Sequence, residues 1–430
     1  MHDVEDLNIK QEILPFFDFT LNSFSRLSLG KLMITPLESP DRIRERQQVL
    51  KGFISNAGIF REYTYSRTDF YEVKRFLTES SVNKLNFSDR LRLLISENDR
   101  MALKARFIQL ITFFNKLNSW YLGRITKDDF PDGYKAGLAL LQDFLQKFNL
   151  PFYDRLILEN RFRNRHIAEL SEIVTKLQTA GEIVSFYNRL AEFEAMLSVS
   201  QGILKYGFVF PEISSNDLII NELYHPLVKN PVINNFSGFH NVTLLTGPNM
   251  SGKSTYLKSI GVCIWLAHIG LALPAASARI PFYTGIFVSI NHSDDIARGY
   301  SHFMQEVLRV KSVLNEAVNG QKCFAVFDEL FKGTNPDDAL EISAATIAGM
   351  TRLNNSVFII STHLHLLNKI KENEAGDINT CHLDCDIDGE RPFFSYKLRE
   401  GWSDLRIGTL LFKQAGIYRL LAATIEPMIS

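Results

Sequence analysis

A glycine-rich segment near the middle of the chain has the residue types and spacing of a phosphate-binding loop. Residues 247–254 read GPNMSGKS and fit the pattern G-x-x-x-x-G-K-[ST]. The glycines let backbone N–H groups approach phosphate oxygens, Lys253 supplies a positive charge, and the Ser254 hydroxyl can ligate Mg²⁺. We predict a nucleotide site formed by Gly247, Pro248, Asn249, Met250, Ser251, Gly252, Lys253, Ser254 and Thr255.

Two later apolar runs end in residues that complete such a site. CFAVFDE ends in Asp328, predicted to hold Mg²⁺ together with Ser254, and in Glu329, predicted to polarise the attacking water as a catalytic base. VFIISTH ends in His363, a second predicted catalytic residue, which could hydrogen-bond the γ-phosphate or that water.

A second anion site is predicted where a small loop leads into a helix. Gly299 and Ser301 precede residues whose apolar members have helical spacing, and a helix N-terminus attracts anions. Because the chain already has a phosphate loop, we expect Ser301 to contact ATP bound on another copy, in an ATP-dependent homodimer. The alternative is a solvated helix cap with Ser301 as the N-cap.

A parallel sheet is the element that would bring these residues together. Short apolar strands are predicted at 242–246, 323–327 and 357–361, and they alternate with helical patterns at about 252–268, 301–318 and 339–352. This alternation predicts a layered α/β domain with a largely parallel sheet.

The first half of the chain has a different pattern. It is mostly helical, for example over 99–120 and 164–200, with proline and glycine breaks near 36–40, 131–133 and 149–151. We therefore predict a helical domain over 1–205 and a nucleotide-binding domain over 206–430.

The composition of the chain excludes several classes of protein. The net charge of −1 over 430 residues excludes a chain that coats nucleic acid by bulk charge. Cys263 and Cys323 lie in apolar runs, which predicts buried, reduced thiols and a cytoplasmic protein. Residues 259–278 carry no charge and are long enough for a membrane span, but they begin inside the helix after the phosphate loop and contain Pro274. We expect a buried helix and no membrane.

The motifs together resemble the ATPase domain of the MutS family of DNA mismatch-repair proteins. The resemblance is carried by TGPNMSGKSTYLKSIG, FDELFKGTNPDD, STH, DDIARGYSHFMQEV and the upstream YHP, and residues 27–53 resemble the opening of the family's helical core, or lever, domain. It implies a helical lever followed by an ABC-type P-loop ATPase domain, with ATP and Mg²⁺ as cofactors. It also implies an ATP-sandwich dimer, in which two ATP molecules are held between the ATPase domains of two subunits. ATP hydrolysis coupled to conformational change, and DNA as a partner, are implied as well.

Two loops depart from the family's motifs. The family usually reads DE-x-GRGTS where residues 328–335 read DELFKGTN. Its serine-glycine-arginine-serine-threonine loop is here RGYSH, residues 298–302, which keeps Gly299 and Ser301 only. These departures bear on the sensing of ATP across a dimer, and not on ATP binding.

The family's mismatch reader is an N-terminal domain that inserts a Phe-x-Glu wedge into the minor groove. This chain has Phe70-Tyr71-Glu72, but the triplet follows the start of the lever, so we predict that Phe70 is a core residue and that Glu72 faces solvent. We expect a short form without the reader, with weak, salt-sensitive DNA binding that is not mismatch-specific. Arginines within 153–166 could contact phosphates or form a solvated helix face.

The sequence therefore predicts an ATP-dependent, DNA-binding or DNA-damage-sensing ATPase of the mismatch-repair family. One alternative is an ATP-driven protein scaffold or switch with little mismatch recognition, and DNA-stimulated ATP turnover would distinguish the two. A small-molecule kinase is disfavoured, because Glu329 and His363 with a second anion loop form an ATP-sandwich pattern.

Overall fold

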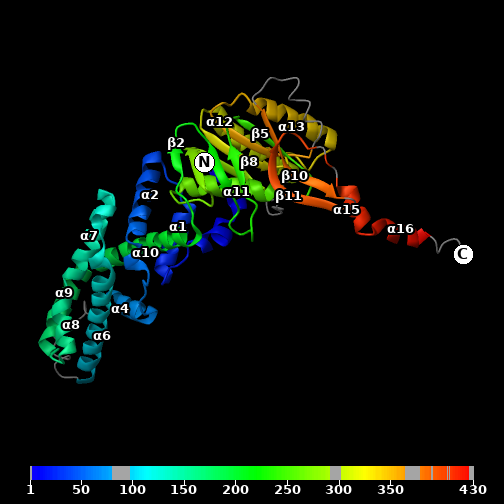
Figure 1. Cartoon of the computed structure of the whole chain (residues 1–430). Coiled ribbons are helices and arrows are strands. Elements are labelled where there is room, and N and C mark those ends of the chain that lie inside the picture. Colours follow the sequence, from blue (N-terminus) through cyan, green and yellow to red (C-terminus); the bar gives the residue numbers. More distant parts are fainter. Residues whose placement is uncertain are drawn as a thin grey trace. The chain divides into compact units, whose positions relative to one another are not determined.

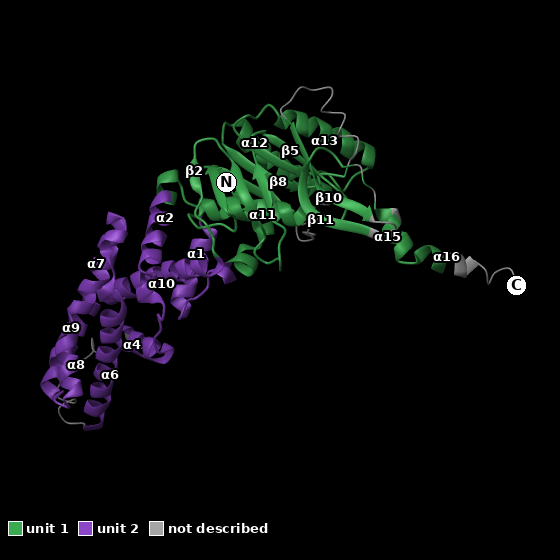
Figure 2. Cartoon of the chain, viewed as in Figure 1, with its two compact units in different colours: residues 1–13, 36–43, 207–430 green, residues 14–35, 44–206 purple. Residues whose placement is uncertain are grey.

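The computed structural model describes residues 2–79, 97–290, 302–363, 378–388, 391–403, 405 and 407–425. The chain forms two compact units, coloured separately in Figure 2. Unit 1 consists of Met1–Ile13, Pro36–Ile43 and Gly207–Ser430, and unit 2 consists of Leu14–Thr35 and Arg44–Tyr206. Unit 1 thus includes two segments that the sequence pattern grouped with the helical domain.

The first of these segments belongs to unit 1 because it extends the sheet of that unit. Strand β1 (His2–Asp3) pairs in parallel with β7 (Gly285–Ser289). The Asp6 carboxylate accepts a hydrogen bond from the Ile290 amide at 2.8 Å. The second segment is attached by the Leu37 amide, which donates to the carbonyl of His268 at 2.9 Å. A strand of two residues leaves no periodic pattern in the sequence.

A seven-stranded sheet forms the core of unit 1. Its order is β1-β7-β8-β9-β5-β10-β11, and every neighbouring pair is parallel except β10 with β11. The predicted α/β layer with a largely parallel sheet is confirmed. Three strands match the predicted ones, with one more residue in β8: β5 (Val242–Thr246), β8 (Cys323–Asp328) and β9 (Val357–Ser361). Strands β10 (Ile378–Asp388) and β11 (Arg391–Glu400) were not predicted.

Helices cover both faces of this sheet (Figure 1). On one face, α12 (His302–Val318) and α13 (Pro336–Met350) share an apolar core with β5, β7, β8 and β9. On the other lies α11 (Lys253–His268), which is buried nearly all round. The buried helix predicted within 259–278 is thus confirmed up to His268, where α11 ends. Helix α13 begins three residues before its predicted start, because Asn335 caps it and Pro336 suits the first turn.

The remaining elements of unit 1 are short. A second sheet has the order β2-β6-β3-β4, and its strands are β2 (Glu212–Ser214), β3 (Ile219–Leu223), β4 (Asn234–Ser237) and β6 (Ser277–Pro281). Two helices follow β11, namely α15 (Gly408–Gln414) and α16 (Ile417–Ile425). Near the N-terminus are the helical turns Glu5–Leu7 and Ile9–Ile13.

The described part of unit 2 is helical, as predicted. Its core is rich in phenylalanine and tyrosine and includes Phe70, which is 2% exposed, whereas Glu72 is exposed; both predictions are confirmed. The segment 164–200 is two helices, because Gly181 has a left-handed φ of 71°. The helices are α1 (Ser23–Ile34), α2 (Pro40–Ser55, which begins in unit 1), α3 (Ala57–Phe60), α4 (Arg67–Glu79), α6 (Glu97–Lys116), α7 (Asp132–Gln146), α8 (Leu150–Leu158), α9 (Asn164–Thr179) and α10 (Glu182–Tyr206), with short turns at Leu14–Phe16, Leu117–Tyr121, Leu122–Arg124 and Lys127–Asp129.

Within the ranges that the structure describes, no helix is both long enough and apolar enough to cross a membrane. Cys263 and Cys323 are buried free thiols, as the sequence predicts.

Candidate functional site

Three neighbouring strands of the main sheet end at the predicted site. Strands β8, β9 and β5 lie side by side and run in parallel, so their carboxyl ends meet at one edge of the sheet. Strand β5 leads into the glycine-rich loop, β8 ends at Asp328, and β9 ends at Ser361, two residues before His363. Ligands of open α/β sheets bind at this kind of edge.

The glycine-rich loop has the backbone of a phosphate cradle. Gly247 and Gly252 have φ values of 133° and 95°, in the region that glycine adopts most readily, and Gly252 is the N-cap of α11. The buried Lys253 ammonium donates to the carbonyls of Gly247 at 2.8 Å and Pro248 at 3.1 Å. Burial lowers the pKa of Lys253, Glu329 and Asp328 oppose that shift, and Lys332 adds to it. The lysine is thus held at the loop by hydrogen bonds that a phosphate could replace.

Two side chains that could supply oxygen ligands to a metal ion meet at the start of α11. The Ser254 hydroxyl donates to Asp328 Oδ2, and the Ser361 hydroxyl donates to Asp328 Oδ1. Mg²⁺ prefers oxygen ligands and binds through one or two carboxylates together with substrate phosphates and water. The donor set of Ser254 and Asp328 therefore fits this ion.

The Glu329 carboxylate is held by two side chains. Its Oε2 lies 2.8 Å from Lys332 Nζ and 3.1 Å from His363 Nδ1. Burial raises the pKa of Glu329, but the hydrogen bonds and charges of His363 and Lys332 outweigh burial and bring it to about 2. The Glu329 amide also donates to Ser361 Oγ at 3.1 Å, which fixes the start of the turn after β8. The carboxylate is thus ionised and oriented at the site.

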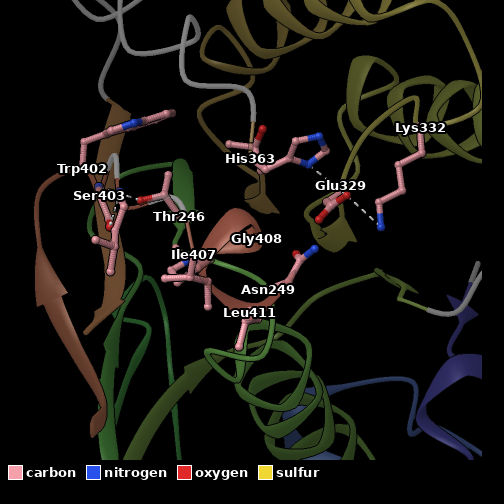
Figure 3. A pocket seen from close by; sticks show the side chains of 14 residues that line it. Thr246, Asn249, Glu329, Lys332, His363, Trp402, Ser403, Ile407, Gly408 and Leu411 are labelled. Atoms are coloured by element: carbon pink, nitrogen blue, oxygen red, sulfur yellow. Dashed lines mark hydrogen bonds and ion pairs between the residues drawn. The ribbon is translucent and has the colours of Figure 1, made fainter. Parts of the chain in front are cut away.

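Two cavities meet at Glu329. One, of about 470 Å³, is lined by the loop, by Lys253, Ser254 and Asp328, and by Tyr396. The other, of about 460 Å³, is lined by His363 and by the segment that contains Trp402 (Figure 3). Asn249, Glu329 and Lys332 line both. Each cavity has the size of a small-molecule site.

The comparisons with known proteins agree with this geometry. Residues 243–424 match the family model described as MutS domain V. The chain is 33% identical to the DNA mismatch repair protein MutS of Fusobacterium nucleatum over 95% of its own length and 44% of that protein. It is 25% identical to the protein of the same name from Staphylococcus haemolyticus over 97% of its own length and 47% of that protein.

The chain belongs to the MutS family. It spans about half the length of these two MutS proteins.

The turn after Glu329 shows how the chain accommodates its departure from the MutS motif. Phe331 stands where the motif DE-x-GRGTS has its first glycine, and its φ of 59° is one that glycine favours. Glu329 also has a positive φ, 65°. The Phe331 ring is 4% exposed and lies edge-on to Phe303 of α12, with centroids 6.2 Å apart. Burial of the ring therefore offsets a strained backbone.

Substitutions at Phe331 should separate backbone strain from ring burial. Phe331→Ala and Phe331→Gly both remove the ring, so both should be less stable than the wild type. Phe331→Gly should be the more stable of the two by about 1 kcal/mol, because only alanine is strained at this φ. Chemical denaturation of both variants measures the difference. A Phe331→Ala protein as stable as Phe331→Gly would show that the backbone is not strained.

The structure places all of the predicted site residues except Ser301. The structure brings the loop residues, Asp328, Glu329 and His363 to one edge of the sheet, whereas Ser301 lies outside the described residues. Ser361 and Lys332 were not assigned roles from the MutS motifs, although both lie within them in the sequence. Tyr396 and Trp402 had no sequence signal, because β11 and the segment after it reach the site only through strand pairing.

Proposed function

We propose that this chain binds and hydrolyses ATP at the edge of the main sheet, as the ATPase part of a mismatch-repair machine. The observation that carries the proposal is the contact between the phosphate-loop serine and the β8 carboxylate, Ser254 with Asp328, beside Lys253 and Glu329 in one cavity. P-loop ATPases use such a pair to hold Mg²⁺ against the β- and γ-phosphates.

Each side chain then has a role in hydrolysis. Lys253 leaves the loop carbonyls and contacts the outer phosphates, and Ser254 and Asp328 hold Mg²⁺. When bound by these two residues, Mg²⁺ would supply positive charge against the phosphate oxygens. Glu329 orients the attacking water and accepts its proton, and His363 hydrogen-bonds the water or the γ-phosphate.

A third cavity supports the placement of the nucleoside. It has a volume of about 380 Å³, shares Gly252, Thr255 and Tyr396 with the phosphate cavity, and is also lined by His225 and Ser251. His225 Nε2 and Ser251 Oγ are buried there with no hydrogen-bond partner among the described residues. Tyr396 is 44% exposed and offers a ring for stacking. We assign this cavity to the base and ribose.

The proposal includes an ATP-dependent homodimer. Helices α15 and α16 continue beyond the end of β11 (Figure 1), and they expose the apolar side chains of Phe412, Tyr418, Leu420 and Leu421. An exposed apolar surface on helices is typical of a protein interface. A second copy of the chain is the partner that the sandwich arrangement requires, and Ser301 is proposed to meet the γ-phosphate of the partner's ATP.

Sedimentation with Mg-ATP tests the dimer. Glu329→Gln should block hydrolysis and accumulate an ATP-bound dimer, whereas the double variant with Ser301→Arg should stay monomeric and still bind ATP. The larger arginine side chain would occupy the space proposed for the γ-phosphate of the ATP bound to the other copy, so the two copies could not pair. A monomer in both cases, or a dimer in both cases, would exclude the sandwich.

DNA is the proposed partner of the ATP cycle. Four exposed arginines lie along α8, the connection after it and the start of α9: Arg155, Arg161, Arg163 and Arg165. Arg161, in the connection, also pairs with Glu159 at 3.1 Å. The alternative is a scaffold that uses ATP-driven pairing to recruit proteins. ATP turnover that rises when DNA is added supports the first function, and turnover indifferent to DNA supports the second.

A further inference from the structure

Lys332 lies where the two cavities beside Glu329 meet. It lines both of them, and its Nζ lies 2.8 Å from Glu329 Oε2. The same oxygen accepts the hydrogen bond from His363 Nδ1 at 3.1 Å, and Figure 3 shows both side chains pointing at the carboxylate. The oxygen of the proposed base is therefore contacted by two donors.

In the ion pair between Lys332 and Glu329, Lys332 is the side chain that can move. Its side chain is 39% exposed, whereas that of Glu329 is 11% exposed. A lysine is a flexible stem with three rotatable donors, and an ion pair open to solvent is weak. The backbone beneath it is fixed, because Leu330 and Phe331 are both buried. The ammonium can thus change partner while its point of attachment stays in place.

An anion in the phosphate cavity would give Lys332 a new partner. Lys253 and Lys332 line that cavity together, and their charges are close enough for Lys332 to lower the pKa of Lys253. Two ammonium groups that repel each other across a cavity favour an anion between them. The triphosphate chain, extended from Lys253 toward Glu329, would place its last phosphate at Lys332.

We propose that Lys332 senses the γ-phosphate: its ammonium pairs with Glu329, as the structure shows, and moves to the terminal phosphate when a nucleoside triphosphate binds. This movement frees one of the two occupied acceptor positions on Glu329 Oε2 for the attacking water, while His363 keeps the other. The base can therefore accept a proton only when a triphosphate is bound. A diphosphate does not reach Lys332 and leaves it on Glu329. The inference rests on the proposed nucleotide site and adds a positioning residue to it.

Equilibrium binding of two nucleotides tests this role without any turnover. The wild type and Lys332→Met are titrated in Mg²⁺ with ADP and with a non-hydrolysable β,γ-imido analogue of ATP. Lys332→Met should bind the triphosphate analogue about tenfold or more weakly and ADP within about twofold of the wild type, because only one phosphate loses a charge-assisted hydrogen bond. Lys332→Gln should behave likewise, and Lys332→Arg should keep most of the preference for the triphosphate analogue over ADP.

Lys176→Met is the matched control, because it removes an exposed lysine that pairs with Glu172 at 2.8 Å in unit 2. It should change neither affinity. An unchanged preference for the triphosphate in Lys332→Met, or an equal loss for both nucleotides, would overturn the sensor. A wild type that binds neither nucleotide would instead overturn the nucleotide site itself, and the sensor with it.

Discussion

Glu329→Gln is expected to bind ATP as tightly as the wild type and to lose at least about a hundredfold in ATP turnover. A positioned general base contributes about 10²–10⁴-fold to a rate, and an amide cannot accept the proton of the attacking water. Glutamine has the same size and can still hydrogen-bond His363, so the fold and the phosphate cavity should persist. Steady-state phosphate release and equilibrium ATP binding measure the two effects separately.

The matched control is Glu341→Gln, the same chemical change on an exposed position of α13. It should leave turnover unchanged. Turnover at the wild-type rate in Glu329→Gln would remove this residue from its role as the base. Loss of ATP binding in the same variant would mean that Glu329 holds the site together.

Phe70→Ala is expected to lower the stability of unit 2 by about 3–5 kcal/mol, the usual cost of removing a buried phenylalanine. The Phe70 ring stacks on Tyr65 with centroids 5.5 Å apart, and it lies edge-on to Phe113 at 6.2 Å and Tyr187 at 5.7 Å. Alanine would leave a cavity among these rings. Phe152→Ala is the control, because that ring is 45% exposed on α8 and should cost much less. Thermal and denaturant unfolding compare the two.

DNA binding distinguishes a core residue from a mismatch wedge. At a temperature where Phe70→Ala is folded, it should bind matched and mismatched duplexes as the wild type does, weakly and with strong salt dependence. Fluorescence polarisation at two salt concentrations measures this. A folded Phe70→Ala protein that had lost a preference for mismatched DNA would identify Phe70 as a wedge.

The strands that form the site could be predicted from sequence because they are buried on both faces. Every residue of β5 and β8 is buried. Strand β5 therefore consists of apolar and β-branched residues, and β8 is apolar up to Asp328, which marks the sheet edge. The helical break at Gly181 was less visible. A single glycine within an apolar pattern does not reveal that its φ is positive until the packing of α9 and α10 is known.

Residues that depend on long-range pairing could not be assigned. Tyr396 reaches the phosphate and base cavities only because β11 pairs with β10, with a register shift between Leu383 and Cys385 that no local pattern encodes. Lys332 was visible as a departure from the MutS motif. Its contact with Glu329 depends on a turn with two positive φ values, at Glu329 and Phe331, which the sequence alone argues against.

Titration calorimetry of Mg-ATP is the most direct test of the nucleotide site. The wild type should bind one ATP per chain, and Lys253→Ala should lose that binding, because the lysine provides the buried positive charge in the phosphate cradle. Saturable binding in the wild type that disappears in Lys253→Ala is the predicted result. A wild type that does not bind Mg-ATP, or a Lys253→Ala protein that binds it equally well, would contradict the account.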